Sequence, residues 1–190
     1  MNKFLWTQIF KLSGWKIKGT FPKGLKKAII VAGPHTSNWD FPLGLGARAI
    51  GGFPANFMIK DSWTKLPIIG KGFIAMGAVP VDRSKDREKS MTELTIEQMR
   101  ERDEFVLCIA PEGTRKYQPK LKSGFWHIAK ETNTPMVPMS FDYPSKTVYW
   151  NEPIFPSDNK EADMLKIEKI LGQYSGKFPE QGIRVPKKEI

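Results

Sequence analysis

The chain has 190 residues, of which 40% are apolar and 26% are charged, so it is long enough for one globular domain with a hydrophobic core. Its single cysteine, Cys108, excludes an intramolecular disulfide framework and is typical of a protein from a reducing compartment. The formal net charge of +10 indicates a polyanionic partner, which is either a nucleic acid or an anionic lipid surface.

The positive charge is concentrated at the N-terminus, where residues 1–27 carry seven lysines and no acidic residue. On a helical wheel this segment has one broad apolar arc. The arc consists of Met1, Phe4, Leu5, Ile9, Leu12 and Trp15, with Trp6 and Phe10 at its flanks. Lysines and aromatic residues around an apolar stripe predict that residues 1–18 form an amphipathic helix on a membrane surface. A helix packed on the domain is the alternative, while a spanning helix would need roughly 20 mostly apolar residues without such lysines.

The remaining chain alternates between strand and helix patterns. Short apolar runs predict strands at residues 27–32, 56–59, 79–81, 104–109, 136–141 and 147–150. Helices are expected at residues 38–50, 86–103, 124–132 and 161–174, the second of them exposed because it is highly charged. This alternation predicts an α/β fold, a single-domain sandwich over residues 19–190 with a largely parallel central sheet flanked by helices. Ligands bind beyond the carboxyl ends of strands in such sheets, so the loops after residues 32 and 109 are candidate site loops.

The first of these loops reads Gly33-Pro34-His35-Thr36-Ser37-Asn38-Trp39-Asp40. Positions five apart on a helix diverge by about 140°, so His35 and Asp40 meet only if the chain bends between them. Ser37 and Asn38 are good N-cap residues, which places His35 before a helix and Asp40 in its first turn. An imidazole oriented by a carboxylate is a general base, and because no nucleophile elbow is present, it would activate a substrate hydroxyl. From this pair alone, a structural loop histidine is an equal alternative.

The second loop contains Glu112-Gly113-Thr114-Arg115. Gly113 allows a close approach of the backbone to a ligand, Thr114 offers a hydroxyl, and Arg115 matches a phosphate with its planar fork. Lys60 and Arg83, each near a predicted strand end, would add positive charge. The alternative is a turn with a surface ion pair.

Four blocks in this order resemble the glycerolipid acyltransferases, the superfamily that contains 1-acylglycerol-3-phosphate acyltransferase. His35 and Asp40 match a histidine and an aspartate separated by four residues, with Ser37 also at its family position. The three later blocks are matched by Gly77 to Arg83, by Pro111 to Arg115 in full, and by Val137-Pro138. The order and spacing agree over residues 28–142, and the first and third blocks carry the specificity of the resemblance.

The resemblance implies that His35 deprotonates an acceptor hydroxyl, which attacks the thioester of acyl-CoA or acyl-carrier protein, while Asp40 orients His35. It also implies that Arg83 and residues 112–115 hold a glycerophosphate-like acceptor such as lysophosphatidic acid, and that no metal or bound cofactor is required. The N-terminal helix fits a peripheral enzyme of phospholipid biosynthesis on the cytoplasmic side of the cell membrane, which draws a lysolipid from the bilayer.

Several residues depart from the family pattern close to the acceptor-binding blocks. Pro34 replaces the usual asparagine before the histidine, and Pro80 interrupts the apolar run before Arg83. Ala110 stands where phenylalanine often occurs, and Lys116 stands where serine often follows the arginine. None of these changes removes a catalytic group, so they concern the acceptor, and a lyso-aminolipid is the alternative acceptor.

Functions of other classes remain as alternatives. A basic nucleic-acid-binding module would explain the charge, but the sequence has no recognisable binding motif, and no nucleic-acid partner is expected. A metal hydrolase would use His35 and Asp40 with His127 as a third ligand. However, His127 stands among apolar neighbours on a predicted helix, where a histidine usually belongs to the core. A catalytically inactive protein with the same fold is the last alternative.

Overall fold

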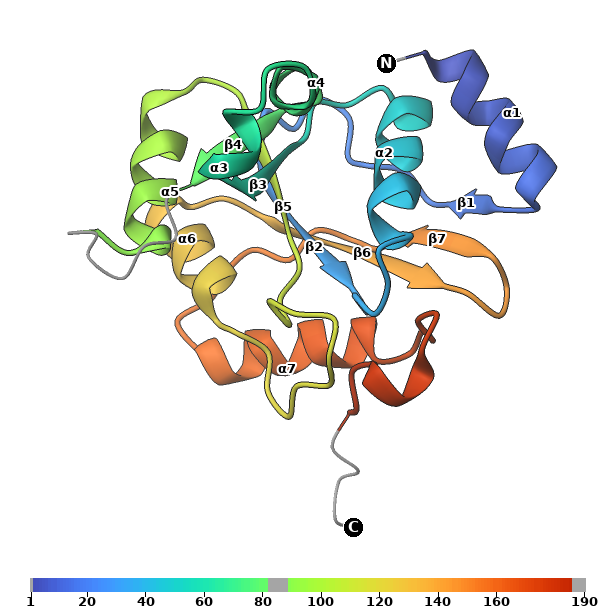
Figure 1. Cartoon of the computed structure of the whole chain (residues 1–190). Coiled ribbons are helices and arrows are strands. Elements are labelled where there is room, and N and C mark those ends of the chain that lie inside the picture. Colours follow the sequence, from blue (N-terminus) through green and yellow to red (C-terminus); the bar gives the residue numbers. More distant parts are fainter. Residues whose placement is uncertain (1, 82–88, 186–190) are drawn as a thin grey trace, which may run out of the picture.

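A seven-stranded sheet forms the centre of the computed structural model, which describes residues 2–81 and 89–185 (Figure 1). The strands lie in the order β1-β7-β6-β2-β5-β3-β4. Their bounds are β1 (Lys16–Lys18), β2 (Lys27–Gly33), β3 (Asn56–Lys60), β4 (Ala78–Val81), β5 (Phe105–Ile109), β6 (Met136–Asp142) and β7 (Thr147–Trp150). The β6–β7 pair is antiparallel and every other pair is parallel, so the predicted α/β fold with a largely parallel sheet is confirmed.

Helices cover both faces of this sheet (Figure 1). Their bounds are α1 (Lys3–Ser13), α2 (Asp40–Gly51), α3 (Asp61–Thr64), α4 (Ile69–Ala75), α5 (Met91–Glu101), α6 (Gly124–Thr132) and α7 (Lys160–Leu171), with a short 3-10 helix at Pro179–Gln181. Alternate residues of the central strand β2 enter two hydrophobic clusters, Ile29 on one side and Ile30 on the other. The Ile30 cluster includes side chains of α1 and α2, whereas the Ile29 cluster includes those of α5, α6 and α7. A strand buried on both faces needs the continuous apolar run that β2 has.

The elements at 124–132, 136–142 and 147–150 lie where the sequence predicts them, but the start of α2 does not. The helix begins at Asp40 rather than at residue 38, and Trp39 is its N-cap without a side-chain cap. The Ser37 hydroxyl instead accepts a hydrogen bond from the Trp39 amide at 3.2 Å. The predicted capping by Ser37 and Asn38 is therefore wrong. The elements β1, α3 and α4 were not predicted from the sequence, because they are short and lack a clear period.

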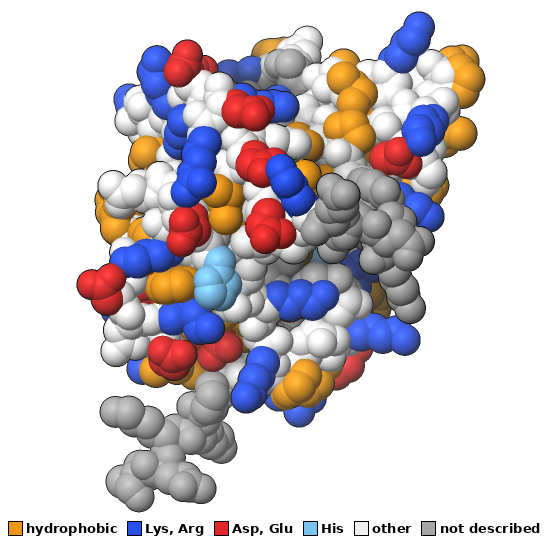
Figure 2. All heavy atoms as spheres, turned by 90° about the vertical axis from the view of Figure 1, so that its left-hand side faces the viewer, with side chains coloured by type: hydrophobic (Ala, Val, Ile, Leu, Met, Phe, Trp, Pro, Cys, Tyr) orange, Lys and Arg blue, Asp and Glu red, His pale blue; other side chains and the backbone are white. Residues whose placement is uncertain are grey.

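The charged segment predicted as an exposed helix at 86–103 forms α5, with residues 82–88 lying outside the described part of the chain. Ser90 and Glu93 form a capping box at its start, and Thr95 and Met99 are buried against the domain. The helix is thus half-buried rather than fully exposed. Figure 2 shows the side of the molecule on which α5 lies in Figure 1, and basic and acidic side chains are mixed there. A nucleic-acid-binding face is expected to carry one sign of charge.

The N-terminal helix α1 packs on the domain along one side, as in the second interpretation that the sequence left open, and exposes apolar side chains along the other. Phe10 is buried, and its ring lies against Gly46 of α2. On the other side four apolar side chains are exposed, and we call them the α1 stripe: Phe4, Leu5, Ile9 and Leu12. The helix ends at Ser13 before Gly14 in the left-handed conformation, and residues 16–18 join the sheet as β1. In the described parts of the chain, no helix has the length and apolar character needed to cross a membrane.

Candidate active site

The loop between β2 and α2 brings His35 and Asp40 together. The chain leaves β2 at Gly33, passes a cis Gly33–Pro34 peptide bond and bends, so that Asp40 becomes the first residue of α2. His35 Nδ1 then lies 3.0 Å from Asp40 Oδ2. The five-residue spacing that a helix could not bridge is closed by this bend. The N-terminus of α2 also favours the negative charge of the Asp40 carboxylate.

The Asp40 carboxylate is buried and is held by four hydrogen bonds. The backbone amides of Thr36 and Ser37 donate to Oδ2 at 3.0 and 2.9 Å, and His35 Nδ1 approaches the same oxygen. The hydroxyl of Tyr143, which follows β6, donates to Oδ1 at 2.6 Å. A carboxylate in this position accepts a proton-bearing Nδ1, so Nε2 is the ring nitrogen with the free lone pair. This is the tautomer of a general base.

Glu112 contacts the backbone of His35 and does not line the cavity described below. Its Oε1 accepts a hydrogen bond from the backbone amide of His35 at 2.7 Å, and only 2% of the residue is exposed. Burial raises the pKa of Glu112, against the lowering effect of this hydrogen bond. Its second oxygen, Oε2, is buried without a hydrogen-bond partner in the described structure. The carboxyl group thus holds the loop that carries His35, a role that the local sequence did not reveal.

The rest of the second loop faces the same opening as His35. Gly113, Thr114 and Arg115 line a cavity together with His35 and Asp40. Arg115 is exposed, and its guanidinium donates a hydrogen bond to the side-chain oxygen of Asn38. The structure therefore joins the two loops at one sheet edge, as expected from the parallel strands.

Lys60 and Arg83, which were also predicted for the site, differ in what the structure describes of them. Lys60 is the last residue of β3, is exposed, and is not part of the cavity lining. Arg83 lies outside the described residues. Their roles in substrate binding stay predictions.

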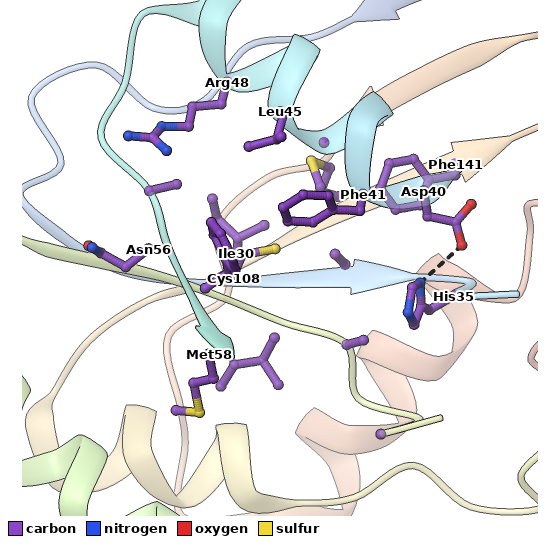
Figure 3. A pocket seen from close by; sticks show the side chains of 18 of the residues that line it. Ile30, His35, Asp40, Phe41, Leu45, Arg48, Asn56, Met58, Cys108 and Phe141 are labelled. Carbon is purple, nitrogen blue, oxygen red and sulfur yellow. Dashed lines mark hydrogen bonds and ion pairs between the residues drawn. The ribbon is translucent and has the colours of Figure 1, made fainter. Parts of the chain in front are cut away.

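The cavity has a volume of about 640 Å³ and runs between α2 and the sheet. Figure 3 shows His35 and Asp40 at one end, Arg48 and Asn56 at the other, and mainly apolar side chains between them. This middle part includes Ile30, Phe41, Met58 and Cys108, while Phe141 lies beside Asp40. The volume and the apolar lining are typical of a site for a small, largely apolar ligand.

Three polar residues of the cavity were not singled out as functional from the sequence. The Arg48 guanidinium donates a hydrogen bond to the Met76 carbonyl, and the Asn56 amide donates to the Gly77 carbonyl at 3.1 Å. Burial raises the pKa of the Cys108 thiol to about 12, so this thiol stays protonated at neutral pH. A protonated thiol is a poor nucleophile, which agrees with chemistry carried by His35.

His127 does not belong to the core, because its side chain is exposed on α6. The expectation that it is a satisfied core histidine is therefore wrong. In residues 2–81 and 89–185, no group of three or more His, Cys, Asp or Glu side chains is arranged to hold a metal ion.

Comparison with known proteins adds two findings. Residues 16–142, well over half of the chain, match the family described as Acyltransferase. The fold is similar to the crystal structure of the 1-acyl-sn-glycerophosphate (LPA) acyltransferase PlsC from Thermotoga maritima, with a TM-score of 0.65 and 19% sequence identity over 90% of this chain and 75% of that chain. No curated protein matches the sequence. At this identity the likeness to the crystal structure concerns the fold alone.

Proposed function

The chain belongs to the acyltransferase family, and on this premise we propose that it transfers a fatty acyl group from an acyl thioester to the hydroxyl of a lysolipid. The donor is acyl-CoA or acyl-carrier protein, and the acceptor is a lipid such as 1-acyl-glycerol-3-phosphate. The observation that carries the proposal is a histidine–carboxylate pair at the end of an apolar cavity, with Arg115 at the same opening.

His35 acts as the general base in the proposed reaction. Its Nε2 takes the proton of the acceptor hydroxyl while the hydroxyl oxygen attacks the carbonyl carbon of the thioester. The ester C–O bond forms, the C–S bond breaks, and the imidazolium returns the proton to the leaving thiolate. Asp40 holds the ring in the correct tautomer and stabilises the positive charge that develops on it. No metal or bound cofactor takes part in these steps.

The apolar cavity accommodates an acyl chain in this proposal. Asp40 and Arg48 are eight residues apart on α2, so the two ends of the cavity are separated by about 12 Å along the helix axis. Side chains such as Ile30 and Phe41 between them offer a chain of methylene groups an environment from which water is excluded. The reacting carbonyl would then lie next to His35.

Arg115 is proposed to bind the phosphate of the acceptor. Its exposed guanidinium lies at the cavity opening, and the hydrogen bond to Asn38 fixes it beside the catalytic loop. A planar fork of N–H donors matches a phosphate better than a lysine does. Arg83, Thr114 and Lys60 are further candidates for this role.

The protein is proposed to act as a peripheral enzyme on the cytoplasmic side of the cell membrane. The α1 stripe is exposed while the opposite side of α1 packs on α2, so the helix can enter the headgroup region without leaving the domain. Lysines of residues 1–27 would add an attraction to anionic lipids.

The proposal is tested by incubating the purified protein with labelled acyl-CoA or acyl-carrier protein and a panel of lysolipids. The panel includes lysophosphatidic acid and a lyso-aminolipid, and mass spectrometry identifies the products. We expect a diacyl product from at least one lysolipid, formed about 10²–10⁴-fold more slowly by the His35→Ala variant. Product formation at the wild-type rate by His35→Ala would contradict the mechanism.

A further inference from the structure

The exposed apolar side chains of the protein are unevenly distributed. Fifteen large hydrophobic side chains are exposed in the described residues, and eleven of them belong to the first 75 residues. Besides the α1 stripe, a second group lies on the α3–α4 segment, and we call it the α3–α4 patch. The patch consists of Trp63, Leu66, Ile68, Ile69 and Ile74, with Ile68 exposed to 86%. Five large exposed apolar side chains within one segment of twelve residues indicate an interaction site.

Helices α3 and α4 pack on each other and contact β3 and β4. Gly70 lies so close to α3 that an added Cβ would be 2.1 Å from the Thr64 carbonyl oxygen. A row of edge-to-face aromatic rings runs from Trp63 through Phe73 and Phe57 to Phe41. The last two rings line the cavity, so the patch continues into the wall of the proposed acyl site.

The surroundings of the patch indicate which partner covers it. Lys60 directly precedes α3, Lys71 belongs to α4, and both are exposed. An exposed tryptophan near lysines is typical of a lipid headgroup region. The aromatic row also places α3–α4 on the same sheet face as α2, since Phe73 contacts Phe57 and Phe57 contacts Phe41 of α2. Helix α1 belongs to this helical layer as well, since its Phe10 is in the same hydrophobic cluster as Ala47 of α2.

We propose that the α3–α4 patch is a second contact with an anionic bilayer, alongside the α1 stripe. This inference rests on the proposed function, since a lipid substrate has to pass from the bilayer to the cavity. Two contacts in one helical layer would hold the cavity wall against the membrane, which α1 alone would not do.

The test compares Ile68→Asp with Phe155→Asp in binding to vesicles of phosphatidylcholine that contain phosphatidylglycerol. Both residues are exposed. Phe155 follows Ile154, which forms a β-bridge with Met136, the first residue of β6. Phe155 therefore lies near the amino ends of the parallel strands, whereas His35 lies at their carboxyl ends. Ile68→Asp should weaken vesicle binding about tenfold or more, because a charge replaces an inserted apolar group. Phe155→Asp should bind like the wild type.

Equal binding of the wild type and Ile68→Asp, or no vesicle binding by the wild type, would overturn the inference. A change of oligomeric state in Ile68→Asp with unchanged vesicle binding would instead assign the patch to a second copy of the chain. Acyl transfer to a short-chain soluble lysolipid is measured separately and should be the same in Ile68→Asp and the wild type. If no lysolipid is acylated, the proposed function fails, whereas the binding result still decides the role of the patch.

A second inference concerns Tyr143, which lies 103 positions after Asp40 in the sequence. Its hydroxyl donates to Asp40 Oδ1 at 2.6 Å, and this is the only hydrogen bond of that oxygen among the described residues. Its ring meets the ring of Trp15 edge-to-face with the centroids 5.1 Å apart. Burial, followed by the hydrogen bond to Asp40, raises the pKa of Tyr143, so the hydroxyl keeps its proton and remains a donor.

We infer that Tyr143 is a positioning residue, which holds the Asp40 carboxylate in the orientation that fixes the tautomer of His35. Without its hydroxyl, Oδ1 would be a buried acceptor with no partner, and the carboxylate would rotate toward other donors. The Tyr143→Phe variant removes this single oxygen and keeps the ring that packs on Trp15. Tyr149→Phe is a matched control, because Tyr149 is also half-buried and its ring packs on that of Tyr174, with the ring centroids 4.6 Å apart.

Tyr143→Phe should lower kcat about 10- to 100-fold with KM unchanged within twofold, because the base is misplaced while the substrate contacts remain. Tyr149→Phe should have wild-type kinetics. The chain has only two histidines, so ¹⁵N NMR resolves the His35 ring with His127 as an internal reference. We expect a smaller population of the Nδ1–H tautomer of His35 in Tyr143→Phe. A wild-type kcat, or an unchanged tautomer in a folded protein, would overturn the positioning role.

Discussion

Gly46 of α2 is the position at which the packing of α1 can be tested most directly. An ideal Cβ at Gly46 would lie 2.2 Å from Phe10 Cε2 and 2.8 Å from Trp6 Cε3. Carbon atoms in contact are about 3.5–4.0 Å apart, so alanine at this position has to displace α1 by on the order of 1 Å. The Gly46→Ala substitution therefore loosens α1 without changing any residue of the α1 stripe.

The expected change in the free energy of unfolding follows from two opposing effects. Overpacking of a buried contact costs about 1–3 kcal/mol, while replacing glycine by alanine inside a helix contributes about 1 kcal/mol. Gly44→Ala on the same helix is the control, because its Cβ would meet Met139 and Phe141 only at ordinary distances of 3.8 and 3.9 Å. The gain in helix propensity is common to both variants. Their free energies of unfolding should differ by about 1–3 kcal/mol, with Gly46→Ala the less stable.

Thermal unfolding followed by circular dichroism measures this difference. For a chain of this size each kcal/mol corresponds to about 2–4 °C, so Gly46→Ala should unfold about 2–12 °C below Gly44→Ala. Amide hydrogen exchange should also become faster in α1 of Gly46→Ala. Equal unfolding temperatures and equal exchange in α1 would show that α1 does not pack on α2 through Phe10.

Three further predictions concern the site. In steady-state kinetics His35→Ala should reduce turnover about 10²–10⁴-fold with the unfolding temperature unchanged. Asp40→Asn should reduce turnover less, because the imidazole remains. Near-normal turnover of His35→Ala would contradict the assignment of His35 as the base. Arg115→Ala should raise KM for a phosphorylated acceptor more than KM for the donor, with partial rescue by Arg115→Lys, and an equal loss with a phosphate-free acceptor would refute phosphate binding. Burial raises the pKa of Glu112 in the folded state, so the unfolding temperature of the wild type should fall as the pH rises from the ordinary glutamate range through this raised pKa. Glu112→Gln should lack this fall. If the unfolding temperatures of the two proteins changed with pH in the same way, the result would argue against a buried carboxylate.

The amino-acid sequence determined the order of elements and the place of the site. Continuous apolar runs such as β2 and β5 predict strands buried on both faces, and helices between strands supply the crossover connections that parallel pairing needs. Parallel strands bring their carboxyl ends to one edge. The loops with His35 and Arg115 therefore had to lie near each other, although they are 80 residues apart.

Only the tertiary structure decided which atoms meet at that edge. Glu112 contacts the His35 amide across 77 positions, and Tyr143 reaches Asp40 across 103. Both contacts depend on the register of β5 and β6 against β2, which apolar patterns do not encode, because any shift by two residues keeps the same face buried. The buried and exposed sides of α1 likewise became distinguishable only in the folded structure. Phe10 and Leu12 are both apolar, but Phe10 packs against Gly46 of α2, where a glycine leaves room for its ring, whereas Leu12 is exposed.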